Sequence, residues 1–247
     1  MEVHKQHPSD DHSSFKQAQV VVVMVAFPCQ SHLNQLLQLS CLISSYNILV
    51  HYACSVTHIH QVKHQFTDIN RLENTQINFH ELPTPPFISP PPNPNNSSKF
   101  PSHLQPSFEA TLHLRESMTA LLHRISPAAR RVIVIHDALL AYVVQDIANV
   151  PNAESYSFSP ISAFSSFFEG WELTGKCILA EKEPEGLPSI EGCYTFEILN
   201  FIALQGNFLK LAAGYIYNTC RSIEGTYIDL LAKEEVNTTS RSGRLGR

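Results

Sequence analysis

Two segments of this sequence carry side chains suited to acid–base chemistry. The apolar run Val20–Phe27 leads through a short loop into a helical pattern whose first turn contains His32. A second apolar run, Val132–Ile135, leads directly into His136 and Asp137. A carboxylate beside an imidazole holds the ring in one tautomer and stabilises the imidazolium form. The pair His32 and Asp137 is therefore suited to removing a proton from a hydroxyl group.

The spacing also predicts where these two side chains lie. In an open parallel sheet, ligands bind beyond the carboxyl ends of the strands, and both residues fall just past such ends. Ser31 is expected to cap the helix that follows, whose partial positive charge disfavours a charged His32 and keeps it available as a base. An alternative stays open: a surface histidine at a helix start, with Asp137 acting only as a helix cap.

The pattern of strands and helices predicts an α/β fold. We expect strands over residues 19–27, 48–54, 76–82, 131–135, 154–158 and 215–218, and helices over 32–45, 57–70, 106–125, 138–149, 162–175, 195–213 and 223–235. Alternation of this kind is typical of a doubly wound, Rossmann-like parallel sheet, whose strands are continuous apolar runs because both faces are covered.

Two further segments could shape a binding site. Residues 83–106 hold nine of the sixteen prolines, which predicts a long, stiffened loop without a central helix or strand. A later helix carries aromatic residues at helical spacing. Core packing explains them, and the wall of an apolar pocket is the alternative; they are Phe164, Phe167, Phe168 and Trp171.

Composition and missing motifs exclude several classes of function. The net charge of −5 offers no basic surface for nucleic acid. The run Val20–Phe27 is too short to span a bilayer, and six cysteines without a C-x-x-C pair fit reduced thiols in a cytoplasmic protein. Dinucleotide, Walker and G-x-S-x-G motifs are missing. His60 and His64 stand four residues apart, but an exposed helix face accounts for them without a metal.

Four segments resemble plant UDP-dependent glycosyltransferases, which have the GT-B architecture. Residues 27–35 read Phe-Pro-Cys-Gln-Ser-His-Leu-Asn-Gln, and residues 100–106, 134–137 and 216–225 add support. The likeness extends over residues 19–231 and is greatest to the zeatin O-glucosyltransferase branch. It implies two Rossmann-like domains, of which the amino-terminal one binds the acceptor and the other binds the UDP-sugar.

The resemblance implies a role for individual residues. His32 would take the proton of an acceptor hydroxyl, Asp137 would share the resulting charge, and the acceptor oxygen would displace UDP from UDP-glucose with inversion. Ser159 would face the donor. A planar apolar acceptor such as zeatin would lie against aromatic side chains, namely Phe87, Phe158, Phe164 and Phe168. No metal and no cofactor beyond the donor substrate are implied.

The sequence also departs from the family pattern. Ser31 stands where the family usually has glycine, and the tryptophan-led sugar-nucleotide box is missing. We expect a polar, disordered segment over 1–18, an acceptor domain over 19–235, a tail over 236–247 that departs from the family pattern, and no donor domain. The isolated chain is then expected to have little transferase activity and to bind a UDP-sugar only if a carboxyl-terminal domain is supplied. The rival hypotheses are a non-catalytic acceptor-binding module and a truncated pseudo-enzyme.

Overall fold

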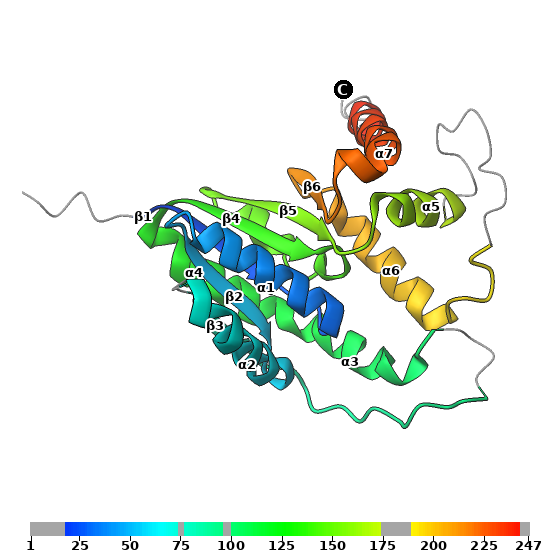
Figure 1. Cartoon of the computed structure of the whole chain (residues 1–247), viewed down its shortest axis with the longest axis horizontal. Coiled ribbons are helices and arrows are strands. Elements are labelled where there is room, and N and C mark those ends of the chain that lie inside the picture. Colours follow the sequence, from blue (N-terminus) through cyan, green and yellow to red (C-terminus); the bar gives the residue numbers. More distant parts are fainter. Residues whose placement is uncertain (1–17, 74–76, 96–99, 174–188, 243–247) are drawn as a thin grey trace, which may run out of the picture.

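A computed structural model describes residues 18–73, 77–95, 100–173 and 189–242. Within these ranges lies one parallel sheet of six strands in the order β3-β2-β1-β4-β5-β6 (Figure 1). The strands are β1 (Ala18–Val25), β2 (Leu49–Ser55), β3 (Ile77–Leu82), β4 (Ala129–Asp137), β5 (Ala153–Ser159) and β6 (Gly214–Tyr217). The order reverses direction between β1 and β4, which is the feature that defines a doubly wound sheet. The predicted fold class is confirmed.

The sheet is buried on both faces. Along β1, Val21, Val23 and Val25 belong to one apolar cluster, whereas Val22 and Met24 belong to another. Successive side chains of a strand point to opposite faces, so this central strand needs a cover on each side. That requirement explains why its sequence is continuously apolar.

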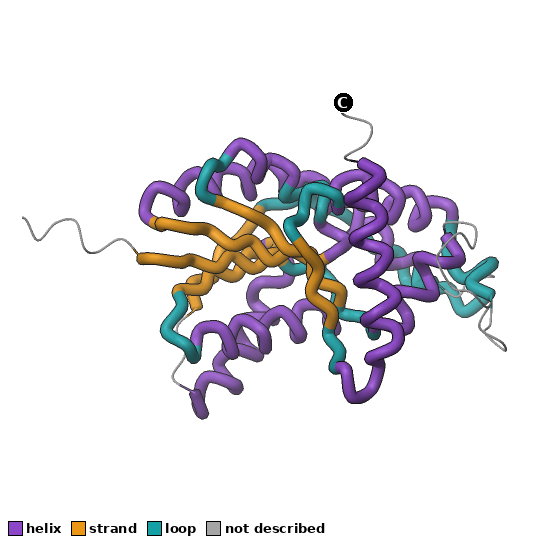
Figure 2. Tube along the Cα trace, turned by 90° about the horizontal axis from the view of Figure 1, so that it is seen from above, coloured by secondary structure: helices purple, strands orange, loops and turns teal. Residues whose placement is uncertain are grey.

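Two layers of helices provide the cover, and Figure 2 shows strands with helices on either side. Helices α1 (Gln30–Ser44) and α2 (Val56–Glu73) pack on one face. Helices α3 (Gln105–Ala110), α4 (Arg115–Ile125) and α6 (Phe196–Leu209) contribute to the cluster on the other face. A smaller apolar cluster joins α5 (Ala163–Leu173) to α7 (Arg221–Ser242) beside β6.

The strand predictions are confirmed to within two residues at each end, but two of the helix predictions are wrong. The helix expected over 106–125 is broken by a 3₁₀ segment, η3 (Thr111–Leu114). There the hydroxyl of Thr111 donates to the carbonyl of Phe108 at 2.6 Å, which competes with regular helical bonding.

The second wrong prediction is the helix over 138–149. The structure has two 3₁₀ segments instead, η5 (Ala138–Leu140) and η6 (Gln145–Asn149). Between them the backbone N–H of Tyr142 donates to the side chain of Gln205 at 2.9 Å, so it is bonded outside its own segment. A tertiary contact thereby replaces a bond that a continuous helix would make.

The other helix predictions differ from the structure in their ends and, in α7, by one interruption. The helix expected over 162–175 is α5, and residues 174–175 lie outside the described residues. Helix α7 reaches Ser242, past the predicted end at 235, and Glu224 interrupts it with φ −126° and ψ 28°. In the proline-rich loop predicted over 83–106, residues 83–95 have no helix or strand. The prediction is wrong at its carboxyl end, where η2 (Ser102–Leu104) is a 3₁₀ segment and α3 begins at Gln105. Of the disordered segment predicted over 1–18, residues 1–17 lie outside the described residues, and Ala18 begins β1.

Candidate active site

The strand register brings His32 and Asp137 together. In the parallel pair of β1 and β4, Val25 lies opposite His136. The segments that follow the two strands therefore leave the sheet at the same level. Asp137 ends β4, and α1 starts five residues after Val25. His32 Nδ1 and Asp137 Oδ2 are 2.7 Å apart. The structure thus places the two residues as predicted, and their catalytic role stays a prediction.

This hydrogen bond fixes the tautomer of His32. An ionised carboxylate can only accept hydrogen bonds, so Nδ1 is the donor and carries the ring proton. Nε2 is left with a lone pair, as a general base requires. The side chain of Asp137 is fully buried, and that of His32 is 16% exposed. The carboxylate is therefore shielded from water while the imidazole can meet a ligand.

Asp137 also caps a short helical segment. Its other oxygen, Oδ1, accepts from the backbone N–H of Leu139 at 3.0 Å at the start of η5. The contact to His32 that a relay needs and the contact to a backbone N–H that a cap needs are both present, one on each oxygen. The cap holds the carboxylate in the orientation that places Oδ2 on His32.

The site lies where the strand order reverses. β2 and β3 follow β1 to one side, and β4, β5 and β6 follow it to the other. In doubly wound sheets the connections diverge at this point and leave a crevice beyond the carboxyl ends of the strands, which is where ligands bind. The topology therefore places the His32–Asp137 pair at the expected ligand position.

The start of α1 differs from the prediction. Cys29, not Ser31, occupies the N-cap, and its side chain makes no capping hydrogen bond. The first turn also lacks an acidic residue, so the partial positive charge of the helix end is not compensated there. Tyr52 anchors this turn from β2, because its buried hydroxyl donates to the carbonyl of Leu33 at 2.9 Å. Burial raises the pKa of Tyr52 well above its usual value and keeps the hydroxyl protonated.

A second histidine adjoins the pair but does not compete with it. His136 is 1% exposed, and its Nδ1–H donates to the carbonyl of Asp137 at 2.8 Å. Burial lowers the pKa of His136, so the ring stays neutral. It supports the backbone of Asp137 without adding a charge beside the carboxylate.

An aromatic cluster that the sequence analysis missed reaches the His32–Asp137 pair. The Phe27 ring lies 5.3 Å from that of His32, 4.5 Å from Phe108 and 6.0 Å from Phe201. Phe100 extends the cluster, 5.9 Å from Phe108. The only signal in the sequence was that residues 27–35 and 100–106 both appeared in the family resemblance. Nothing in the periodicity joins them to α6.

The predicted acceptor residues lie elsewhere. Phe158 is 4% exposed and belongs to the apolar cluster under α1 and α2, so the structure gives it a core position. Phe164 and Phe168 pack with α7, where the Phe164 ring is 5.0 Å from that of Tyr227. The core-packing alternative therefore describes these two residues. Phe87 is half-buried in the proline-rich segment.

The segment after β6 forms hydrogen bonds to α1 and α5, the two helices that form the rim of the site. Asn218 donates from Nδ2 to Gln35 on α1 at 2.8 Å, one turn beyond His32. The Glu224 carboxylate accepts from the backbone N–H groups of Ala163 at 3.0 Å and Phe164 at 3.2 Å, and so caps α5. Its interruption of α7 is the conformation in which it makes these contacts.

Ser159 ends β5 at the same edge of the sheet. Its hydroxyl lies 3.1 Å from that of Ser166 on α5. The backbone N–H of Asn218 donates to its carbonyl at 3.2 Å. The structure thus places Ser159 on the rim that Glu224 and Asn218 hold, and its donor-facing role stays a prediction.

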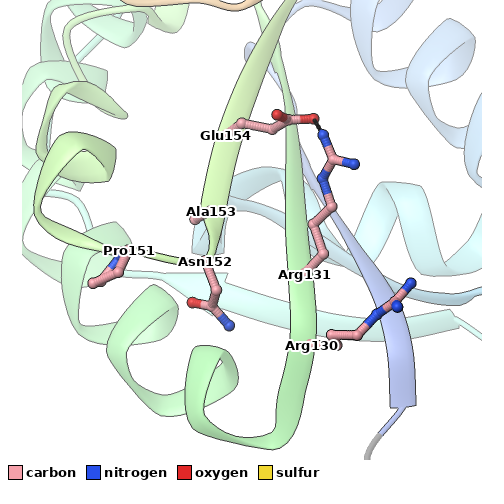
Figure 3. Close-up of a pocket in the computed structure, with 6 residues that line it drawn as sticks. All are labelled: Arg130, Arg131, Pro151, Asn152, Ala153 and Glu154. Carbon is pink, nitrogen blue, oxygen red and sulfur yellow. Dashed lines mark hydrogen bonds and ion pairs between the residues drawn. The ribbon is translucent and has the colours of Figure 1, made fainter.

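Other features of the described residues lie apart from this site. Figure 3 shows a hollow lined by Arg130, Arg131, Pro151, Asn152, Ala153 and Glu154 at the starting ends of β4 and β5, opposite to the end that carries Asp137. In the part of the chain that the structure describes, no three His, Cys, Asp or Glu residues gather as metal ligands would. His60 and His64 lie on an exposed face of α2. None of the described helices has the length and apolar character needed to cross a bilayer.

Comparisons with known proteins agree with this architecture. The family model described as "Glycosyltransferase, N-terminal domain" matches residues 18–246. The chain is 45% identical over 217 residues to a zeatin O-xylosyltransferase of Phaseolus vulgaris, covering 88% of this chain and 46% of that protein. It is 46% identical over 222 residues to a zeatin O-glucosyltransferase of Phaseolus lunatus, covering 90% and 47%. The chain thus spans slightly less than half the length of these relatives.

The fold is shared with a solved plant enzyme. A UDP-glucosyltransferase from Polygonum tinctorium, which is capable of glucosylating indoxyl, superposes with a TM-score of 0.59 at 18% identity, covering 86% of this chain and 49% of that one. The sheet with its flanking helices is therefore that of the amino-terminal half of such an enzyme. From the family match and these relatives, the chain belongs to the glycosyltransferase N-terminal domain family.

Proposed function

We propose that this chain is the acceptor-binding, base-bearing half of a zeatin-type O-glycosyltransferase that uses a UDP-sugar. The observation that supports it most is the 2.7 Å contact between His32 Nδ1 and the buried Asp137 at the switch point of the sheet. The identity of 45% and 46% to two zeatin O-glycosyltransferases points to the same substrate class.

The proposed reaction uses the free lone pair of His32. Nε2 takes the proton of the acceptor hydroxyl as its oxygen attacks the anomeric carbon of the sugar. The bond between that carbon and the UDP oxygen breaks, UDP leaves, and the configuration inverts. Asp137, 2.7 Å from Nδ1, stabilises the imidazolium that forms.

The aromatic cluster offers a surface for a planar apolar acceptor. Phe27 adjoins the imidazole, but Phe27, Phe108 and Phe201 are 1%, 6% and 5% exposed and are core residues, as Phe158 is. We propose that Phe100, which is half-buried and lies 5.9 Å from Phe108, offers the accessible ring on which a planar acceptor stacks. Aromatic rings suit this task because flat ligands stack on them with large contact area.

We do not assign the binding of the UDP-sugar to these residues. In the family that the sequence resembles, the UDP-sugar lies against the other Rossmann-like domain, and this chain corresponds to 46–47% of its relatives. For these 247 residues taken alone, we propose acceptor binding with little transfer. Stabilisation of the departing UDP charge would need groups from the other half.

Calorimetric titration of the chain with trans-zeatin and, separately, with UDP tests the proposal. We expect saturable zeatin binding and no UDP binding. Phe100→Ala should weaken zeatin binding, whereas Tyr46→Ala, which removes an exposed ring beyond the carboxyl end of α1, should not. UDP binding without zeatin binding would contradict the assignment of this half to the acceptor.

A further inference from the structure

A hollow of about 430 Å³ lies between the edge strand β3 and helix α4, on the opposite side of β1 from β4. Residues Phe79–Leu82 form one side. The other side is one face of α4, with Ser117, Leu121 and Arg124 at helical spacing. Leu82 and Leu121, each 3% exposed, are its most buried lining residues. The volume lies in the range of sites for small molecules.

Two histidines and an arginine form a hydrogen-bonded chain at this hollow. Arg124 Nη2 lies 3.3 Å from His80 Nδ1, and His80 Nε2 lies 2.7 Å from His51 Nδ1. A guanidinium group has donors only, so His80 Nδ1 accepts and its proton is on Nε2. That proton is donated to His51, whose own proton is then on Nε2. Both rings are therefore neutral in this arrangement.

The charges around the hollow leave one cation unbalanced. Glu81 lines the hollow, but Lys63 from α2 pairs with it at 2.8 Å. Burial and the charge of Arg124 lower the pKa of His80, and burial, His80 and Arg124 lower the pKa of His51 to about 4. Within the described residues Arg124 has no carboxylate partner, and its one hydrogen bond goes to a neutral ring. No described residue accepts a hydrogen bond from the other N–H groups of the Arg124 guanidinium.

We propose that this hollow binds a small organic anion, with its carboxylate or phosphate group on Arg124 and its apolar part against the half-buried Phe79 and the exposed Ala120. A guanidinium fork matches the geometry of both oxyanions. The hydrogen bond to His80 holds one edge of the Arg124 guanidinium in place and leaves its other N–H groups for the ligand. A cation is disfavoured because Glu81, the one carboxylate among the described lining residues, is already paired with Lys63. The site is separate from the His32–Asp137 pair, and the proposal does not depend on transferase activity.

Titration of the whole chain with benzoate and with inorganic phosphate, at constant ionic strength, tests the proposal. The imidazole ¹⁵N signals of His80 should shift on binding, and those of the buried His136 should not. Arg124→Gln should weaken binding by about tenfold or more, because the charged fork is lost. Arg130→Gln is the matched control: it removes an exposed arginine at the other hollow and should change affinity by less than about twofold.

The two probes distinguish the ligand chemistry. Saturable binding of benzoate alone supports a carboxylate with an apolar body, and binding of phosphate alone supports a phosphate group. The proposal is overturned if neither probe saturates, or if the Arg124→Gln chain binds as well as the unaltered chain. Zeatin binding, measured on the same variants, should be unchanged, so failure here is distinguishable from failure of the proposed function.

Discussion

Replacing Asp137 with asparagine is expected to move the ring proton of His32 from Nδ1 to Nε2. Asp137 Oδ1 accepts from the Leu139 N–H at 3.0 Å, and Oδ2 accepts from His32 at 2.7 Å. An asparagine that keeps its oxygen on Leu139 directs its NH₂ group at His32 Nδ1. Nδ1 must then accept, and the proton moves to Nε2. The lone pair that would act as the base is lost although no atom of His32 changes.

The cost in stability is expected to be small. A hydrogen bond to a charged group contributes about 1.5–3 kcal/mol, and a neutral one about 1 kcal/mol. The Asp137→Asn chain should therefore lose about 1 kcal/mol of unfolding free energy, which leaves it folded. A deeper loss is not expected, since the buried carboxylate is replaced by a neutral group that is less costly to bury.

Long-range ¹H–¹⁵N spectra of the imidazoles measure the tautomer directly. The unaltered chain should show His32 protonated on Nδ1, and the Asp137→Asn chain should show it protonated on Nε2. Asp146→Asn, which changes an acid paired with Arg115 away from this site, is the control and should leave the His32 signals unchanged. An identical tautomer in all three proteins would refute the reasoning.

Three further predictions concern the scaffold. Tyr52→Phe removes the hydroxyl that donates to Leu33 at 2.9 Å and should cost about 1 kcal/mol in chemical denaturation; an unchanged midpoint would contradict this. Glu224→Ala removes the cap of α5, so amide exchange at Ala163 and Phe164 should accelerate by at least about tenfold; the matched change Arg221→Ala, which breaks only an exposed ion pair, should not accelerate it. Unfolded His51 takes up a proton near pH 6.5, but the folded residue does so only near about 4. Stability is therefore complete above pH 6.5 and falls as the pH drops between these values. At about 1.4 kcal/mol per pH unit the upper bound is roughly 3.5 kcal/mol, and solvent screening of this half-buried side chain makes the loss smaller. His51→Gln should flatten that part of the pH–stability curve, and an equally steep curve would show that His51 is not the cause.

The sequence was sufficient for the part of the site that strand ends determine. Apolar runs predict the strands, and parallel strands end at one edge, so a histidine just past β1 and an aspartate ending β4 had to be neighbours once β1 and β4 paired. The proximity of His32 and Asp137 follows from that rule and can be predicted without knowing how the side chains are oriented. The tautomer of His32 cannot, because it depends on which oxygen of Asp137 accepts from the Leu139 N–H.

What the sequence could not supply depends on contacts between distant segments. Phe108 and Phe201 reach Phe27 from helices α3 and α6, and a helical pattern shows which face is apolar but not which neighbour that face meets. The wrong helix over 138–149 has the same origin, since Gln205 bonds Tyr142 across 63 positions of sequence. The family resemblance placed Phe164 and Phe168 at an acceptor wall; in the structure they pack with α7, and their contact with an acceptor stays a prediction.

The most direct test of the central claim is the rate of glucose transfer from UDP-glucose to zeatin by a chimera. In it, this chain replaces the matching part of the Phaseolus lunatus zeatin O-glucosyltransferase, with which it shares 46% identity over 222 residues. We predict transfer by the chimera and a loss on the order of 10²- to 10⁴-fold on His32→Ala, the usual contribution of a general base. A His32→Ala chimera that transfers glucose at the same rate would contradict the account.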